Sequence, residues 1–378
     1  MEPLPCDTCL LCRYDGLYVT HGRHRLGSLA CPHRNDFSFI EETLSHLRKR
    51  SDRSGDADRI VEYLATSPLL LSSGASAQNR PQDDAEDASL SEIVQKYASK
   101  TRDPFDFILD LSGLSPIQFE FSERQWQSLV ADCPNIGTTN QYNIEAIIKQ
   151  LFGTTSEEIS LLEARRRWEG LRDLKPSSPI DKDIIWWIEG AIGKFLNSFE
   201  SKINPLAEGC RKGEYLVFYI TPLLQGALNI GTFCRHRWYT PVSFPNEAVD
   251  LLTTFKERPL LCGLIGQPQE CDITKYYGIN CHLARFMKSM LNALYDEYRQ
   301  GGKDPSHLFT LGVQTYMSTI KIFMLEKREV YRLHLLQMVH VPFTFPSYDK
   351  LGDAIRAAWN LRALINYLVG DIRKMMRG

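Results

Sequence analysis

The stretch from Pro259 to Val341 constrains the fold more than any other part of the chain, because its hydrophobic pattern changes period twice. A short apolar run, Leu260–Ile265, ends at Gly266, and a run of this length predicts a buried strand. From about Cys281 to Tyr298 apolar residues recur at spacings of three and four, which predicts an amphipathic helix. Three β-rich runs follow, at His307–Gln314, Thr319–Leu325 and Val330–Leu335. The stretch therefore predicts a strand, a helix and a three-stranded meander.

Helices are predicted on both sides of this stretch, because apolar residues again recur at helical spacing. A long helix is expected over Asp181–Ile203 and another over Tyr215–Leu228, which Pro222 should bend or split. The remaining predicted helices are Leu90–Tyr97, Ser122–Ala131, Asn143–Phe152, Thr155–Leu174 and Tyr348–Met376. The fold class predicted is α+β: a helical N-terminal and middle region followed by a small mixed sheet flanked by helices.

One polar segment marks a domain boundary. Residues 72–89 are rich in Ser, Ala and Asp and lack an apolar period, which is typical of a linker. The predicted organisation is a zinc-binding segment at 1–35, a helical pair at 36–71, the linker at 72–89, a helical region at 90–205 and an α/β core at 206–378.

Composition limits the partners and the compartment. The 378-residue chain has a net charge of −2, so no global basic field points to nucleic acid, and any nucleic-acid surface must be local. No run approaches the roughly 18–20 apolar residues of a membrane span, and the first residues lack the apolar core of a signal peptide. Four of the ten cysteines lie in the first 33 residues and the others are scattered. These features predict an intracellular protein, nuclear or cytoplasmic, with no membrane partner.

The N-terminal cysteines and histidines suggest a metal site. Zinc favours four tetrahedral Cys and His ligands, and closely spaced pairs supply two ligands from one turn. The predicted ligands of a structural zinc ion are Cys6, Cys9, Cys31 and His33. Cys12 with His21 or His24 is the alternative second pair, and chance Cys and His in a segment without fixed structure is the competing interpretation.

The C-terminal part of the chain resembles a known group of proteins. The phrases that carry the resemblance are GEYLVFYITPLLQGAL, the strand before Gly266, HLARFMKSMLNALYDE and LFTLGVQTYMSTIKIFMLEKREVYRL, followed by Val341-Pro342 and a final helix. In their order they resemble the C-terminal core of a group of uncharacterised fungal proteins with a PD-(D/E)XK nuclease-like fold. The resemblance covers roughly Gly213 to Val369 and implies a restriction-endonuclease-like core.

The resemblance also implies where catalytic groups should lie. A PD-(D/E)XK site needs an acid on one strand and an acid-x-Lys unit on the next, so that carboxylates hold Mg²⁺ and the lysine assists. Leu264 stands where the second acid should be and Gly266 where the lysine should be. The first strand, expected at Arg235–Phe244, contains no acid. Glu214 matches an acid often seen on the opening helix of this fold.

Three functions are therefore weighed. The preferred one is a non-catalytic binding protein for nucleic acid or protein, in which Arg235, Arg237, Arg285 and Lys288 would contact nucleic acid. The first alternative is a Mg-dependent DNA or RNA endonuclease with a rearranged site made of Glu214, Asp250 and Glu270 with Lys275 or Lys256. The second alternative is a purely structural protein-interaction scaffold.

Overall fold

The computed structural model describes residues 108–112, 121–134, 144–153, 159–241, 248–268, 273–328 and 330–377. The chain divides into two compact units, one made of Met1–Tyr97, Leu114–Ser128 and Cys271–Lys275, and the other of Ala98–Gly113, Leu129–Glu270 and Tyr276–Gly378. The second unit contains the sheet and nearly all of the described helices. The predicted zinc segment, helical pair, linker and Leu90–Tyr97 helix lie outside the described residues.

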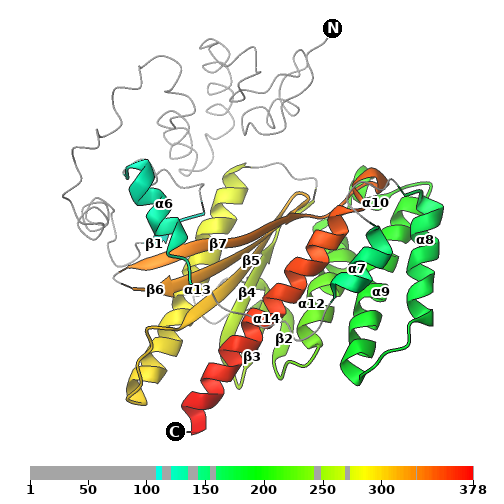
Figure 1. Ribbon diagram of the computed structural model, residues 1–378. Coiled ribbons are helices and arrows are strands. Elements are labelled where there is room, and N and C mark those ends of the chain that lie inside the picture. The colour runs from blue at the N-terminus through cyan, green and yellow to red at the C-terminus, as the bar shows by residue number, and fades with distance from the viewer. Residues whose placement is uncertain are drawn as a thin grey trace, which may run out of the picture. The chain divides into compact units, whose positions relative to one another are not determined.

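The second unit is built on a mixed sheet of seven strands in the order β1-β7-β6-β5-β4-β3-β2 (Figure 1). The strands are β1 Ile108–Asp110, β2 Arg235–Pro241, β3 Ala248–Phe255, β4 Arg258–Ile265, β5 Phe309–Tyr316, β6 Thr319–Lys327 and β7 Tyr331–His340. Neighbouring strands are antiparallel except for the pairs β4–β5 and β1–β7, which are parallel. The predicted strand before Gly266 and the predicted meander are confirmed as β4 and β5–β7.

Strand β3 is absent from the prediction, which placed a strand at Arg235–Phe244 directly before the strand that ends at Gly266. Lys256 and Glu257 join β3 to β4, and both have positive φ angles, 49° and 65°. Two consecutive residues with positive φ are typical of the two-residue turns that match the twist of a hairpin. The prediction missed this turn because neither residue is glycine or asparagine, the usual signals. With β1 and β3 added, the sheet is larger than the small sheet predicted.

The described part of the chain contains nine α-helices. They are α6 Glu123–Ala131, α7 Glu145–Phe152, α8 Leu161–Glu169, α9 Pro179–Glu200, α10 Pro205–Glu208, α11 Lys212–Tyr215, α12 Thr221–Asn229, α13 Ile273–Gln300 and α14 Lys350–Arg377. Short 3₁₀ segments occur at Gly170–Asp173 and Phe345–Ser347. The helices predicted from hydrophobic period in these regions are confirmed, with ends shifted by several residues.

One π-helical segment interrupts the helix that opens the core. Leu216–Ile220 forms this segment, labelled η6, and joins α11 to α12 just before Pro222. Proline lacks an N–H group and its ring crowds the preceding turn, so the helix adjusts locally. The predicted disturbance at Pro222 is therefore confirmed.

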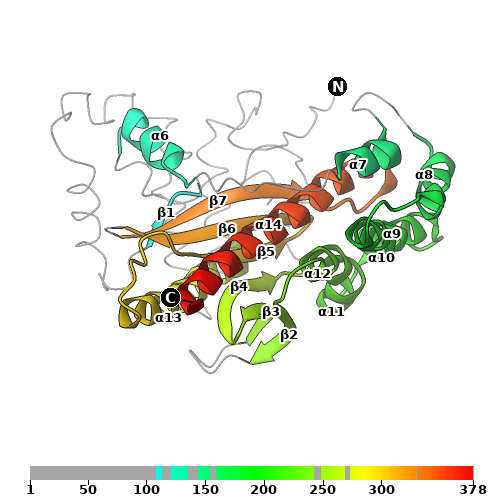
Figure 2. The ribbon, with the colours of Figure 1, turned by 60° about the horizontal axis from the view of Figure 1, so that its bottom comes forward.

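The helices form layers on the two faces of the sheet (Figures 1 and 2). A Cβ atom at Gly312 of β5 would overlap Met287 of α13, so even-numbered β5 residues face α13. On the opposite face, Phe309 stacks on Tyr367 of α14 with ring centroids 6.0 Å apart. The predicted apolar stripe of α14 is confirmed, since every member is buried: Leu351, Ile355, Ala358, Trp359, Leu361, Ile365, Leu368 and Ile372.

Helix α9 packs on α12, which lies between α9 and the sheet (Figures 1 and 2). The indole N–H of Trp187 donates to the Leu223 carbonyl oxygen at 3.0 Å, and its ring stacks on Trp359 at 5.8 Å. The adjacent Trp186 is 58% exposed. The two adjacent tryptophans therefore differ, since Trp187 is buried and Trp186 is exposed. None of the helices in the described part of the chain is long and apolar enough to cross a membrane.

Replacing Gly226 by Ala should destabilise the fold, because a Cβ atom there would overlap the Trp187 ring. Overpacking of a buried contact lowers the free energy of unfolding by about 1–3 kcal/mol. Gly370→Ala is the matched control, since Gly370 is also helical and nothing lies within 4 Å of its Cβ position. Urea unfolding of both variants measures the difference. Equal stabilities would show that the α9–α12 contact is not tight at Gly226.

Candidate functional site

One row of side chains crosses the middle of the sheet at the C-terminal ends of β4 and β5. Leu264 of β4 pairs with Gln314 of β5, and Gln314 pairs with Lys321 of β6. Continuing the register Leu251↔Gly263 by one residue brings Asp250 of β3 opposite Leu264. The row therefore runs Asp250–Leu264–Gln314–Lys321, on the face that α13 covers.

The row is polar although it is buried. Asp250, Gln314 and Lys321 are 7%, 0% and 9% exposed, and Leu264 is half-buried. Functional sites are often formed by buried polar groups at the C-terminal ends of parallel strands. Asp110 of β1 lies within the field of Lys321. Burial raises the pKa of Asp110, although the hydrogen bonds with Ser112 and the positive charge of Lys321 act in the opposite direction.

Asp250 has two partners that hold one of its oxygen atoms. Its Oδ2 accepts a hydrogen bond from the backbone N–H of Ile265 at 2.7 Å and lies 2.9 Å from Nζ of Lys212 in α11. The β3–β4 ladder ends at Leu251, so the carboxylate satisfies an N–H that the ladder leaves unpaired. A metal ion could bind Oδ2 only by displacing the lysine.

The sequence search for a strand acid was wrong about its position. It found no acid on Arg235–Phe244, but the strand next to β4 is β3, and Asp250 lies on it. The signal that could have found it is the β-branched pattern of Ala248–Phe255 between two turns. Asp250 is thus an acid on the strand next to β4.

Leu264 and Gly266, where the resemblance places an acid and a lysine, have no polar side chain. Leu264 has a hydrocarbon side chain and cannot bind Mg²⁺. At Gly266 a Cβ atom would lie 2.7 Å from the carbonyl oxygen of Thr315, closer than real Cβ atoms approach backbone oxygen. The Gly266 N–H also donates to this oxygen at 2.9 Å and to Thr315 Oγ1 at 3.1 Å. No lysine fits at Gly266 while the strands keep this spacing.

Glu214 has a structural partner. Its Oε2 accepts from the backbone N–H of Arg211 at 2.9 Å, which caps the first turn of α11. Tyr239 of β2 has a positive φ of 53°, and its hydroxyl lies 3.8 Å from the Cβ position of Gly213. Partial burial raises the pKa of Tyr239, and the negative charge of Asp250 adds to this effect. Tyr239 therefore stays a neutral phenol beside the Asp250–Lys212 pair.

The other predicted catalytic residues do not complete a site. Glu270 lies outside the described residues, and Lys275 belongs to α13 but its side chain is not described. Lys256 lies in the β3–β4 turn, six residues from Asp250, which corresponds to roughly 20 Å along an extended strand. Among the residues that the structure describes, no three His, Cys, Asp or Glu side chains could share a metal ion. The predicted zinc ligands Cys6, Cys9, Cys31 and His33 fall outside those residues.

The predicted nucleic-acid contacts are only partly accessible. Arg235 is exposed on edge strand β2, and Arg237, two residues further, lies 3.7 Å from Glu257. Arg285 is exposed on α13. Lys288 is only 8% exposed because its ammonium group lies 4.8 Å from the ring centroid of Tyr331 on β7. The expectation that Lys288 faces a nucleic acid is therefore wrong.

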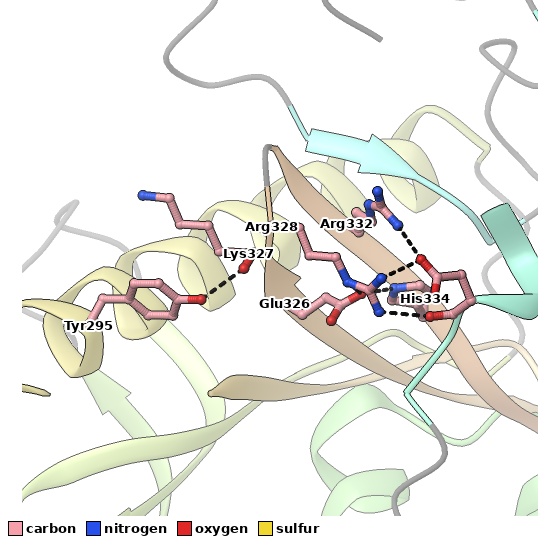
Figure 3. A network of polar contacts seen from close by, with 7 residues as sticks. Tyr295, Glu326, Lys327, Arg328, Arg332 and His334 are labelled. Carbon is pink, nitrogen blue, oxygen red and sulfur yellow. Dashed lines mark hydrogen bonds and ion pairs between the residues drawn. The ribbon is translucent and has the colours of Figure 1, made fainter. Parts of the chain in front are cut away.

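A second polar network lies on the opposite face of the sheet, around the β6–β7 hairpin (Figure 3). His334 Nε2 lies 3.0 Å from Glu326 Oε1, and Arg328 Nε lies 3.2 Å from the same oxygen. Asp132 bridges Arg328 and Arg332, with its Oδ2 2.9 Å from Arg332 Nη1. The network ties the chain after α6 to the end of the hairpin.

His334 has an acid partner that no sequence spacing indicates. Glu326 is eight residues away, but the β6–β7 register brings the two side chains to the same face. Burial, together with the charge of Glu326, raises the pKa of the nearby Cys133 thiol. The raised pKa favours the protonated thiol, which is the less nucleophilic form.

No protein-family model, no curated protein and no solved structure matches the chain.

Asp250→Ala should lower the free energy of unfolding by about 2 kcal/mol, because the Ile265 N–H is left buried without an acceptor. Asp250→Asn should lose less, since its side-chain oxygen can still accept this bond. Asp349→Ala, which removes an exposed pair with Lys350, should change stability by about 0–1 kcal/mol. Denaturant unfolding compares the three variants. A loss in Asp250→Ala no greater than in Asp349→Ala would contradict the assigned role.

Removing Glu326 should be more severe, because it leaves the buried His334 without this partner, whereas the exposed Arg328 keeps Asp132. Glu326→Ala should lower stability by about 3 kcal/mol. A double-mutant cycle with His334→Ala should give a coupling of about 1 kcal/mol or more. Glu163→Ala, which breaks a partly buried pair with Arg167 within α8, is the control for removing a carboxylate outside the network. Additive effects in the cycle would show that Glu326 and His334 do not interact.

Proposed function

We propose that this chain is a non-catalytic binding protein built on a restriction-endonuclease-like core that has lost its metal site. The order of elements supports the core. An opening helix, α11–α12, precedes the antiparallel strands β2–β4; helix α13 then crosses to β5, which is parallel to β4. These are the elements that the sequence resemblance implies, in the same order, with β3 added.

The close approach of Gly266 to Thr315 carries the proposal that catalysis is lost. The Cβ atom of a lysine at this position would collide with the Thr315 carbonyl oxygen. The backbone arrangement therefore excludes a lysine here, so the change involves more than one side chain. The remaining acid, Asp250, is neutralised by Lys212. One carboxylate that already has a cationic partner cannot hold Mg²⁺ in the way two or three can.

The ligand proposed first is nucleic acid or protein, bound on the side of the sheet near β2. Arg235 and Arg237 are two residues apart on an edge strand and so project from one face of it. Guanidinium groups on one face can bind phosphates bidentately. A protein ligand would use the same face without a dependence on phosphate. The buried Lys288 removes one of the four cations expected for nucleic acid, which lowers the weight of that ligand.

A second candidate is a Mg-dependent nuclease with a rearranged site. The observation in its favour is the contact between Asp250 and Lys212, which brings an acid and a lysine together at the sheet end where the family has its chemistry. In this alternative Lys212 would serve in place of the lysine missing at Gly266.

Cleavage of single- and double-stranded DNA and RNA with Mg²⁺ or Mn²⁺ separates these functions. We expect no cleavage above that of the Asp250→Asn variant, because a site with one neutralised acid cannot activate water. Cleavage that the Asp250→Asn and Lys212→Met substitutions both abolish would establish the rearranged nuclease instead.

Binding measured in the same samples tests the ligand. A nucleic-acid ligand predicts binding that weakens steeply with salt, and about a tenfold loss in the Arg235→Ala/Arg237→Ala double variant. Arg377→Ala, an exposed cation at the end of α14, controls for the loss of charge. Binding that is absent at low salt would leave the protein ligand, or the purely structural scaffold, as the function.

A further inference from the structure

The exposed side of α9 carries a line of residues with unlike chemistry. Trp186, Gly190 and Lys194 follow one another at intervals of four, so they lie on one stripe of the helix. Asp183 and Asn197 extend the stripe at its two ends, and all five residues are exposed. Trp186, at 58% exposure, is among the most exposed aromatic side chains of the described residues.

Gly190 has no packing reason within the described part of the chain. At the neighbouring Gly193 packing requires glycine, because a Cβ atom there would lie 2.8 Å from the Trp168 ring. At Gly226 a Cβ atom would overlap the Trp187 ring. At Gly190, no described atom lies within 4 Å of the Cβ position. Glycine inside a helix costs about 1 kcal/mol relative to alanine. A bare backbone at the middle of an exposed stripe is suited to the close approach of another helix.

Aromatic and cationic groups lie on both sides of Gly190. On the N-terminal side, Nζ of Lys182 lies 4.3 Å from the ring centroid of Trp186. On the C-terminal side, Nζ of Lys194 lies 6.0 Å from the ring centroid of Phe218 in the π-helical segment η6. Phe218 and the adjacent Val217 are about half exposed, at 49% and 53%. The apolar surface thus continues from α9 onto η6.

We propose that this face binds a second copy of the chain, with α9 crossing its symmetry mate in antiparallel orientation at Gly190. A two-fold axis at Gly190 brings Trp186 of one copy against the partner's Lys194 and the partner's Phe218. The same rotation brings Asp183 toward the partner's Lys194. Before Gly190 the surface has the Trp186 ring, with Lys182 beside it, and the Asp183 carboxylate; after Gly190 it has the Lys194 ammonium group. The surface is complementary to itself where Asp183 and the Trp186 ring meet the partner's Lys194, as an isologous dimer contact requires.

The chemistry of these contacts favours a second copy over an unrelated partner. An ammonium group over an indole face contributes about 0.5–2 kcal/mol, and the two-fold axis makes the contact twice. The carboxylate of Asp183 and the ammonium of Lys194 have opposite charges in each half of the interface. This dimer does not depend on the nuclease-like site, since α12 separates α9 from the sheet.

Cross-linking at the axis is the first test. In a Gly190→Cys variant the two thiols meet at the two-fold axis, so mild oxidation should give a covalent dimer that reductant dissociates. Gly370→Cys, at another helical glycine with open space at its Cβ position, adds the same number of thiols. It should cross-link no more than the parent chain, which has an exposed cysteine at Cys281. Equal cross-linking in the two variants would overturn the proposal.

A charge exchange then tests the complementarity. Sedimentation velocity of the full chain should show a reversible dimer. Asp183→Lys and Lys194→Asp should each weaken it about tenfold. The variant with both changes should regain part of the affinity, because the charges again oppose one another across the axis while the contact of Lys194 with the partner's Trp186 stays lost. Trp186→Ala should weaken the dimer by at least as much. A chain that stays monomeric at every concentration, or a dimer that none of these variants alters, would overturn the proposal.

Discussion

The packing of α13 against strand β5 joins the two halves of the sheet. Strands β2–β4 form one antiparallel group and β5–β7 another, and the parallel pair β4–β5 connects them. Gly312 lets α13 approach so closely that a Cβ atom would overlap Met287, and Thr310 Oγ1 donates to the Met287 carbonyl oxygen at 3.0 Å. If this contact were looser, β4 and β5 would lose the register that lines up Asp250, Leu264, Gln314 and Lys321.

The same register explains why the candidate site has its present chemistry. At the end of β4 the sheet is held by Gly266, which bonds twice to Thr315, and by Asp250, which bonds to Ile265. Both groups complete backbone hydrogen bonding that the diverging strands would otherwise leave open. Gly266 and Asp250 therefore have a structural role at this end of the sheet.

Hydrophobic period was sufficient to predict the long helices and most strands, because burial of one face determines those elements. It was insufficient where a contact depends on register between distant segments. Lys288 reads as a surface cation, but Tyr331 covers it from β7. His334 finds Glu326 only through the β6–β7 pairing, and Asp250 could be assigned to a strand only once the turn at Lys256–Glu257 was known. That Leu264 and Gly266 have no metal-binding side chain follows from residue type alone.

Strand β1 has a consequence for the order in which the protein can fold. Ile108 pairs with Tyr331, so the two parallel strands come from segments separated by roughly 220 residues, and a loop of that length is slow to close. During synthesis β1 leaves the ribosome long before its partner strand exists. The antiparallel hairpins of β2–β7 contain mostly local pairings and can form first, which leaves one side of β7 as an open edge until β1 arrives. In that interval the nascent chain presents an unpaired strand edge to other chains, and β1 later covers the first part of it, Tyr331–Leu333.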